Sequence, residues 1–197
     1  MLSSGNIFNN AGLYAILVGG GRDNVIENNV INTVNNSFAI YTDNRWPTFD
    51  WAAMKQILGQ VPYTGATWAA KYPALVQPMK NPSWPEGNTI QSNVIIANTP
   101  NSTLFHYFLP KETSSIANNL VWATNGAGIN VSYSILDQSS KSATISWQNW
   151  LQLGVEKNSI NVNPCATISG NQVSFCAGSP INKIGFQALP TDIGLIN

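Results

Sequence analysis

Nine carboxylates are the side chains of this sequence that suit acid–base chemistry, and two of them have an informative spacing. Asp43 is the strongest candidate, because it ends a strand-like stretch, lies two residues from Arg45 and opens a tryptophan-rich segment. Asp23 precedes Asp43 by 20 residues and Arg22 precedes Arg45 by 23. If one such step is one coil of a repeat, two carboxylates and two guanidinium groups would share a face and could bind sugar hydroxyls or a sugar acid.

The same four charged residues also admit a purely structural interpretation. Arg22 with Asp23, and Asp43 with Arg45, could form a ladder of ion pairs that holds two corners of the repeat together. A ladder needs only opposite charges, whereas acid–base cleavage of a glycosidic bond needs two carboxyl groups at a fixed separation. Both interpretations stay open at this point.

Aromatic residues supply the other candidate binding groups. His106 is the only histidine and lies in the aromatic run Phe105–Phe108, where it could line a groove or simply pack. Trp46 and Trp84 could stack on sugar rings, or could pack an inserted segment onto the core. One histidine and two late cysteines cannot make a zinc site, so we expect neither a metal nor a cofactor.

Composition excludes several partners. Charged residues are 9% of the 197-residue chain and the formal net charge is zero, against about 25% charged in ordinary domains. Nine scattered basic residues make no electrostatic footprint for nucleic acid, and no apolar run approaches the roughly 18 residues of a membrane span. The polar share comes instead from 26 asparagines, interleaved with aliphatic and aromatic residues that can form a core.

An internal repeat organises the chain. The pattern Asn-x-Ile-x-x-Asn-x-Ile in residues 24–31 recurs position for position in residues 88–95, with half-copies at 5–8 and 118–121. The steps of 23 and 26 residues suit one coil of a solenoid, and are shorter than a strand–helix–strand unit of about 30 residues or more. Alternation within each copy is typical of strands and would let Ile26 and Val30 point the same way.

Asparagine is suited to the corners between such strands. It tolerates the left-handed conformation, and stacked amides can hydrogen-bond from coil to coil as they do in stacked sheets. Stacked like charges would instead repel. We therefore expect an all-β right-handed parallel β-helix, a β-solenoid, formed as a single domain by residues 1–197. A β-sandwich with Asn-rich turns is the alternative fold.

Three segments interrupt or follow the repeat. Residues 46–85 form a Trp- and Pro-rich insertion, with short helices expected over 49–58 and 68–79, long enough to cover a face or wall a groove. A late helix is expected over residues 146–154, with Trp147, Trp150 and Leu151 on one face and Gly154 as its stop. Residues 178–197 form an irregular tail, which we expect to cap the C-terminal end of the stack.

These blocks resemble the C-terminal coils of bacterial right-handed parallel β-helix proteins of the glycoside-hydrolase type. The resemblance rests on Gly-Asn-Ile-Phe at 5–8, Gly-Gly-Gly-Arg-Asp-Asn at 19–24, Ala-Ile-Tyr-Thr-Asp-Asn-Arg at 39–45 and the tail motifs at 178–186 and 193–195. It implies a polysaccharide or oligosaccharide bound in a groove along the solenoid. On the spacing and residue types described above, Asp43 and Asp23 are the catalytic candidates. The substrate-binding candidates are Arg22, Arg45, Trp46, His106 and Trp84. A non-catalytic β-solenoid module, such as a surface adhesin or a tail-spike-like protein, is the alternative function.

The resemblance begins inside a coil, and the family's upstream aspartate-rich coils have no counterpart in this sequence. We therefore expect the last third of a larger polysaccharide-degrading enzyme, secreted or periplasmic as part of that longer protein, although no signal peptide is visible. An isolated chain of this kind would hydrolyse glycans poorly, and its uncapped first coil, with Ile7 and Phe8, would favour self-association. Cys165 and Cys176 could form a disulfide or remain free thiols.

Overall fold

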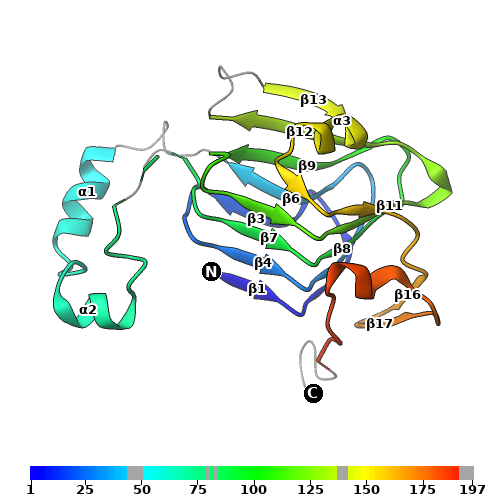
Figure 1. The fold of residues 1–197 in the computed structure, drawn as a ribbon, viewed down its shortest axis with the longest axis horizontal. Coiled ribbons are helices and arrows are strands. Elements are labelled where there is room, and N and C mark those ends of the chain that lie inside the picture. Colours follow the sequence, from blue (N-terminus) through cyan, green and yellow to red (C-terminus); the bar gives the residue numbers. More distant parts are fainter. Residues whose placement is uncertain (44–50, 79, 82–83, 137–141, 191–197) are drawn as a thin grey trace.

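The protein is a stack of coils whose strands form three parallel sheets (Figure 1). The structure, a computed structural model, describes residues 1–43, 51–78, 80–81, 84–136 and 142–190. Each full coil contributes one strand to each of three five-stranded sheets, and every pairing within these sheets is parallel except that of the last strand of the third sheet. The expected all-β parallel solenoid is confirmed, and the β-sandwich alternative is wrong.

The strands are short, as the width of one solenoid face requires. Sheet A contains β1 (Leu2–Ser4), β4 (Val25–Glu27), β7 (Thr89–Gln91), β10 (Ser115–Ala117) and β14 (Glu156–Lys157). Sheet B contains β2 (Ile7–Ala11), β5 (Val30–Thr33), β8 (Val94–Ala97), β11 (Leu120–Ala123) and β15 (Ile160–Asn161). Sheet C contains β3 (Tyr14–Gly19), β6 (Phe38–Asp43), β9 (Ser102–Leu109), β12 (Ile129–Ile135) and the antiparallel β13 (Ser142–Ser146).

The core consists of aliphatic and aromatic side chains stacked in register from coil to coil. In sheet A, Ile26 is paired with Ile90 and Ile90 with Ile116, and all three are at most 2% exposed. Sheet B adds the row Ile31, Ile95 and Val121. Sheet C adds the row Ile16, Ile40, Phe105 and Val131. Because each coil buries its apolar side chains only against the adjacent coils, stability in such a fold comes mainly from neighbour-to-neighbour stacking.

The corner between sheets A and B explains the paired asparagines of the sequence. Its first position has a positive φ in four successive coils, at Gly5, Asn28, Ser92 and Asn118, a conformation that glycine and asparagine adopt at the least cost. The second position holds the ladder formed by Asn6, Asn29, Asn93 and Asn119. Asn29 Nδ2 donates to Asn93 Oδ1 at 3.0 Å, and Asn93 Nδ2 donates to Asn119 Oδ1 at 3.0 Å. The expected amide ladder is confirmed.

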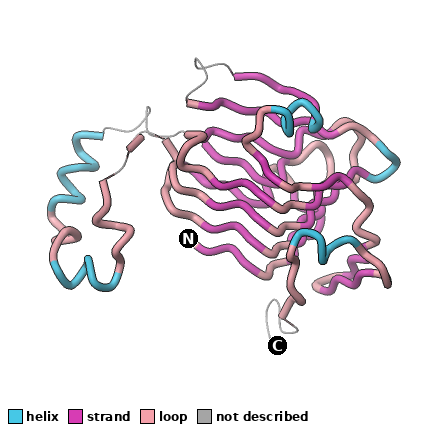
Figure 2. The backbone as a smooth tube through the Cα atoms, viewed as in Figure 1, coloured by secondary structure: helices cyan, strands magenta, loops and turns pink. Residues whose placement is uncertain are grey.

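The insertion between β6 and β7 contains α1 (Trp51–Gly59) and α2 (Ala66–Lys71). In Figures 1 and 2 both helices stand beside the sheets, away from the stacked coils. Trp68 packs on Tyr72 within the insertion itself, and α2 has no buried residue. The first expected helix is present as α1, whereas the second begins earlier and ends at Lys71, before Pro73, rather than running over residues 68–79. Neither helix covers a sheet face. None of the described helices is long and apolar enough to cross a membrane.

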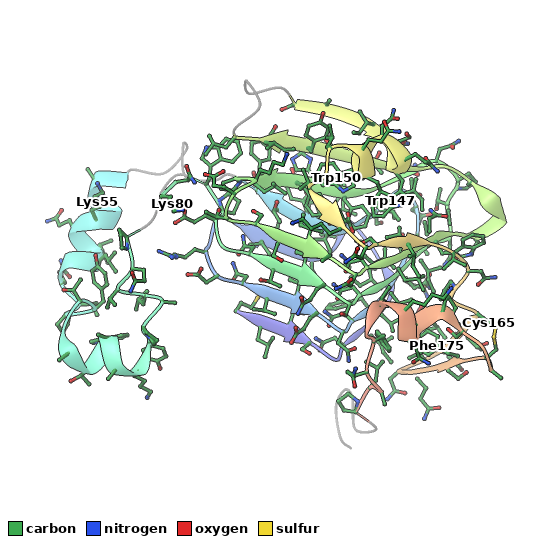
Figure 3. The ribbon with its side chains drawn as sticks, in the orientation of Figure 1. Lys55, Lys80, Trp147, Trp150, Cys165 and Phe175 are labelled. Carbon is green, nitrogen blue, oxygen red and sulfur yellow. A yellow bond between two sulfur atoms is a disulfide. The ribbon has the colours of Figure 1, made fainter. Side chains whose placement is uncertain are left out.

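A helix closes the C-terminal end of the core. The helix α3 (Trp147–Gln152) begins at Ser146, whose hydroxyl accepts from Asn149 N, and Gly154 follows with a φ of +67°. Trp147 and Trp150 are 1% and 0% exposed, and their rings pack on Phe105 and Tyr107 of β9 (Figure 3). The late helix is confirmed, and it is this helix, not the tail, that plugs the end of the solenoid.

The tail packs along the side of the stack instead. After β15 the chain forms a hairpin, β16 (Ala166–Ser169) with β17 (Gln172–Phe175), and then the 3₁₀ helix η3 (Pro180–Ile184). A disulfide joins Cys165 to Cys176 across the base of the hairpin. The carbonyl of Ile184 accepts from Ser92 Oγ, while Gln187 exchanges two hydrogen bonds with the Asn28 side chain. We call residues 164–190 the strap. Its position corrects the expectation that it caps the stack.

Candidate functional site

The outer face of sheet C carries a group of aromatic side chains, which we call the aromatic patch. Along β6 and β9, single surface residues are separated by one or two buried residues, so that one face of each strand lies on the core. The surface positions hold rings from three neighbouring strands, and the end of the insertion adds an indole. The members of the aromatic patch are Tyr14, Phe38, Tyr41, His106, Phe108 and Trp84.

His106 lies at the centre of this patch. Its imidazole stacks on the ring of Tyr41, with centroids 4.2 Å apart and planes 8° apart, because the two residues are register partners on β6 and β9. The ring centroids of Phe108 and His106 are 5.4 Å apart, and those of Trp84 and Phe108 are 5.6 Å apart. The patch therefore presents a continuous row of rings across the coils.

The environment of His106 favours its neutral form. Burial lowers the pKa of His106, and the negative charge of Asp43 opposes that shift. The Nε2 atom of the ring is buried and has no hydrogen-bond partner among the described residues. A neutral imidazole has one nitrogen donor and one nitrogen acceptor, so this side chain retains hydrogen-bonding capacity.

Asp43 belongs to the same region of the molecule. It is the last residue of β6, two residues beyond Tyr41, and its register partner in β3 is Gly19. Its influence on the pKa of His106 shows that the two side chains interact electrostatically. Two of the candidate residues, Asp43 and His106, are thus brought together, and Trp84 joins them through Phe108.

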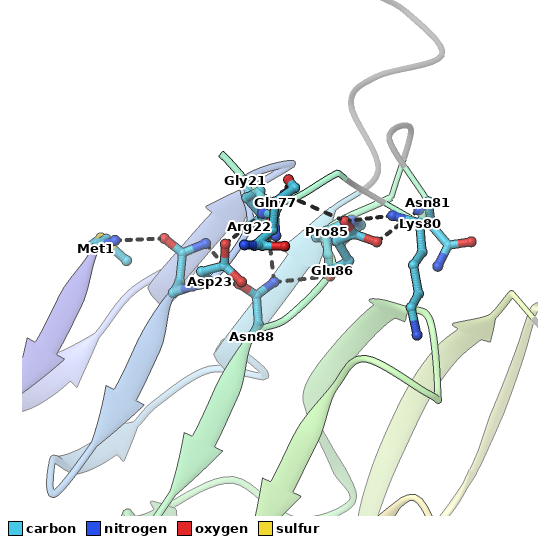
Figure 4. A network of polar contacts seen from close by, with 11 residues as sticks. Met1, Gly21, Arg22, Asp23, Gln77, Lys80, Asn81, Pro85, Glu86 and Asn88 are labelled. Atoms are coloured by element: carbon cyan, nitrogen blue, oxygen red, sulfur yellow. Dashed lines mark hydrogen bonds and ion pairs between the residues drawn. The ribbon is translucent and has the colours of Figure 1, made fainter. Parts of the chain in front are cut away.

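Arg22 and Asp23 form a separate cluster at the corner between sheets C and A (Figure 4). Arg22 Nε donates to Asp23 Oδ2 at 2.5 Å, and Arg22 Nη1 donates to the carbonyl of Gln77 at 3.1 Å. Nη1 also lies 3.9 Å from Oε1 of Glu86. These contacts tie the returning end of the insertion to the first coils.

Glu86 is the centre of that cluster, although the sequence did not single it out. Its side chain is 3% exposed, and its two carboxylate oxygens accept from the backbone N–H groups of Lys80 and Asn81 at 3.1 and 2.8 Å. Asn88 follows it, accepts from Asn24 and donates to the carbonyl of Pro85. A glutamate just before a repeat copy was the signal available in the sequence.

The coil length explains why Asp23 and Asp43 do not stack on each other. The step from Gly19 to its partner Asp43 is 24 residues, four more than the step from Asp23 to Asp43. Asp23 instead donates its backbone N–H to the carbonyl of Glu86 and packs its carboxylate against Gly87. The two aspartates therefore come from neighbouring coils but occupy different positions. Arg45 and Trp46 lie outside the described residues.

The sequence missed most of the aromatic patch. Tyr14 lies on β3 and both Phe38 and Tyr41 lie on β6, and the register of these two strands could not be read before the coil length was known. His106 and Phe108 are both at surface positions of β9, two residues apart, and of these two the sequence singled out only His106. No group of three or more His, Cys, Asp or Glu side chains that could hold a metal ion occurs among the residues that the structure describes.

Comparisons with protein-family models, with curated protein sequences and with solved structures give no match to this chain. The residues and the geometry therefore support a parallel β-solenoid with an outward aromatic patch on sheet C, and the glycoside-hydrolase type remains a resemblance.

Proposed function

We propose that the chain binds a polysaccharide or oligosaccharide along the aromatic patch of sheet C. The observation that carries this proposal is the row of rings around His106, stacked on Tyr41 at 4.2 Å and linked to Trp84 through Phe108. Flat aromatic rings pack against the apolar faces of sugar rings, and the adjacent coils repeat such surfaces along a strand of glycan. The zero net charge of the chain suits a neutral glycan.

Polar groups beside the rings would give this surface its orientation and specificity. His106 is half-buried, and its ring could act as either donor or acceptor toward a sugar hydroxyl, while its Nε2 atom itself is buried and has no partner among the described residues. Asp43 lies close enough to affect the pKa of His106. Binding of a hydroxyl between these two groups would replace water at a site already partly desolvated.

Hydrolysis of the bound glycan is the second candidate function. Asp43 is its proposed acid or base, because it neighbours the patch. A glycosidase normally needs a second carboxyl, and the carboxylate of Asp23 is already paired with Arg22. This pairing supports binding over catalysis for the chain, and it favours a structural role for Arg22 and Asp23.

The binding proposal is tested by affinity gel electrophoresis in gels that contain neutral plant, algal or bacterial polysaccharides. We expect retardation in at least one gel, reduced about tenfold in affinity by Tyr41→Ala or Trp84→Ala, since each removes a stacking surface. Tyr72→Ala is the matched control, because Tyr72 is an exposed ring on the insertion, 47% accessible, outside the patch. Equal effects of all three substitutions would contradict the proposal.

The hydrolysis candidate is tested on any polysaccharide that binds, by the release of reducing ends. Turnover lost in Asp43→Asn but kept in Asp23→Asn would establish catalysis at the patch. If the wild-type chain binds a polysaccharide but releases no reducing ends from it, the chain is a non-catalytic binding module.

The disulfide bears on where such an activity would operate. A bond between Cys165 and Cys176 is typical of proteins in oxidising compartments. We therefore propose that the chain is secreted or periplasmic, where extracellular polysaccharides are accessible.

A further inference from the structure

The outer face of sheet B is apolar and is covered by the strap. One row of outward side chains runs across all five coils in register: Ile7, Val30, Val94, Leu120 and Ile160. These residues pack with Phe175, Ile184 and Phe186 of the strap in a second hydrophobic cluster, separate from the solenoid core. The strap thus covers the outward apolar row of sheet B.

The strap leaves a groove of about 680 Å³ beside the first coil. Among the described residues, it is lined by the hairpin, by η3 and by the chain up to Pro190, with Ile7 as its one lining residue from the solenoid. Pro190 also lies beside Gly5, since a Cβ added there would meet the proline ring at 3.2 Å. The groove therefore lies at the first coil, beside Ile7, which is the first residue of the apolar row.

The backbone beside this groove is a strand edge. Within the described residues, β2 pairs with β5 on one side and with no strand on the other. An open edge of a sheet can accept an extended polypeptide through main-chain hydrogen bonds. A strand that paired with the open edge of β2 would therefore also lie beside the groove.

The amide ladder has a matching open position. The side-chain oxygens of Asn29, Asn93 and Asn119 point toward the coil before each of them. Asn29 Oδ1 accepts from Asn6 N and Nδ2 at 3.1 and 2.9 Å, and Asn93 Oδ1 and Asn119 Oδ1 accept from Asn29 and Asn93 in the same way. In the part of the chain that the structure describes, no group donates to Asn6 Oδ1. The next strand in this series would therefore supply an amide donor at this corner.

We propose that the edge of β2 and the strap groove together bind an extended polypeptide strand that runs parallel to β2. This strand carries a carboxamide residue next to Asn6 and a β-branched apolar residue next to Ile7. The amide continues the ladder, and the apolar side chain enters the groove between Ile7, Phe175 and Leu189. This inference is independent of glycan binding, which concerns sheet C.

A fluorescein-labelled, end-capped peptide that copies residues 24–33 tests the proposal, because it presents Asn29 and Val30 in the required order. Fluorescence anisotropy on the intact chain should rise saturably. A peptide with V30K should bind about tenfold more weakly or worse, since a lysine cannot fill an apolar groove. A peptide with N29L should also bind more weakly, because it lacks the amide donor.

Two variants of the chain provide the matched comparison. Ala188 is exposed and lines the groove, so Ala188→Trp fills it without removing a packed side chain. Ala177 is exposed in the same segment and does not line the groove, so Ala177→Trp is the control. Ala188→Trp should weaken peptide binding about tenfold, and Ala177→Trp should leave it unchanged within about twofold.

The absence of saturable binding at about 1 mM peptide would overturn the proposal, as would equal affinity in Ala188→Trp and Ala177→Trp. Equal binding of the V30K peptide would show that the groove receives no side chain and would overturn it too. A stable dimer, lost in Ala188→Trp and not dissociated by the peptide, would make a second copy the occupant in place of a separate strand.

Discussion

A ladder asparagine links three coils by bonding to groups on the coil before it and the coil after it, as Asn93 shows. Its Oδ1 accepts from the backbone N–H and the Nδ2 of Asn29, while its Nδ2 donates to the carbonyl of Ile26 and to Asn119 Oδ1. The side chain is fully buried. Because water cannot replace these partners, each unsatisfied group would cost about 1–3 kcal/mol.

Replacement of Asn93 should therefore be strongly destabilising. We expect Asn93→Ala to lower the free energy of unfolding by about 3 kcal/mol or more, since it leaves several buried groups without partners. Urea denaturation followed by circular dichroism measures this loss. Asn161→Ala, at an exposed position of β15, should change stability by less than about 0.5 kcal/mol. A similarly small effect at Asn93 would mean that the ladder adds little to stability.

Glu156 ends the same ladder with a buried carboxyl group. Its oxygens accept from Asn119 Nδ2 at 3.2 Å and from Trp150 Nε1 at 2.7 Å. Burial raises the pKa of Glu156 above its usual value of 4.5, against the hydrogen bonds from Ser159, Trp150 and Asn119 that lower it. The folded chain therefore holds this proton at pH values where the unfolded chain has released it.

The raised pKa of Glu156 predicts a pH dependence of stability. Its contribution is most favourable below the unfolded pKa, and declines as the pH rises through the folded pKa, because the charged form must then be buried. Glu156→Gln carries no such charge. In urea titrations from pH 4.5 to 8, the stability of the wild type should fall relative to that of Glu156→Gln. A difference that does not vary with pH would contradict this assignment.

At the scale of elements, the strap decides whether one face of the solenoid meets water. The hairpin places Ile168, Val173 and Phe175 over the outer row of sheet B. The Cys165–Cys176 bond closes a loop of 11 residues in sequence separation, which restricts the conformations of the unfolded segment. The hairpin alone would be marginal in water, so we expect the disulfide to hold the strap in place.

Loss of this bond should release the strap before the solenoid unfolds. The double variant Cys165→Ser with Cys176→Ser should lose about 2–4 kcal/mol of strap stability, increase the fluorescence of a bound apolar dye, and speed hydrogen exchange in β8 and β11. Dithiothreitol should reproduce these changes in the wild type and cause no further change in the variant. Unaltered exchange in both strands would mean that the strap stays docked without the disulfide.

At the scale of the molecule, the two ends of the stack differ. The C-terminal end is closed by α3, whose Trp147 and Trp150 fill the end of the core, and by the antiparallel β13. At the other end, Met1, Leu2 and Leu13 are 63%, 66% and 69% exposed. Because α3 and β13 close the C-terminal end, growth by stacking one end of the solenoid on the other is blocked.

The self-association expected from the sequence stays a prediction, and the structure adds an expected oligomeric state, the dimer. We expect light scattering at high concentration to show dimers and no larger species, because a two-fold interface uses the same surface on both copies and closes. Leu2→Lys with Leu13→Lys should shift the equilibrium to monomers, and the peptide of residues 24–33 should compete. Filaments, or dimers indifferent to both lysines, would show that another surface associates.

The repeat, the corners and the late helix could be predicted from the sequence because each depends on residues close together in the chain. The steps of 23 and 26 residues between repeat copies are the register steps of β2 with β5 and of β8 with β11. At the corner between sheets A and B, Asn28 and Asn118 adopt positive φ values, and the asparagines that follow them stack in the ladder, as their chemistry predicts. The late helix has its cap, its buried tryptophans and its terminal glycine within a few residues of one another. The disulfide, by contrast, was one of two open alternatives.

The relations between distant segments could not be read in the same way. Val30 was expected to point with Ile26, yet Ile26 is in the core and Val30 packs beneath the strap, because the Asn28–Asn29 corner reorients the chain. An apolar outer face is favourable only when another segment covers it, and the residues that cover Val30 lie more than 130 positions away. The spacing of Asp23 and Asp43 misled for a related reason, since coil length varies with the corners. Local conformation and the repeat follow from neighbouring residues, whereas the burial of each face, and the assembly of the aromatic patch, depend on register and on which remote segment packs there.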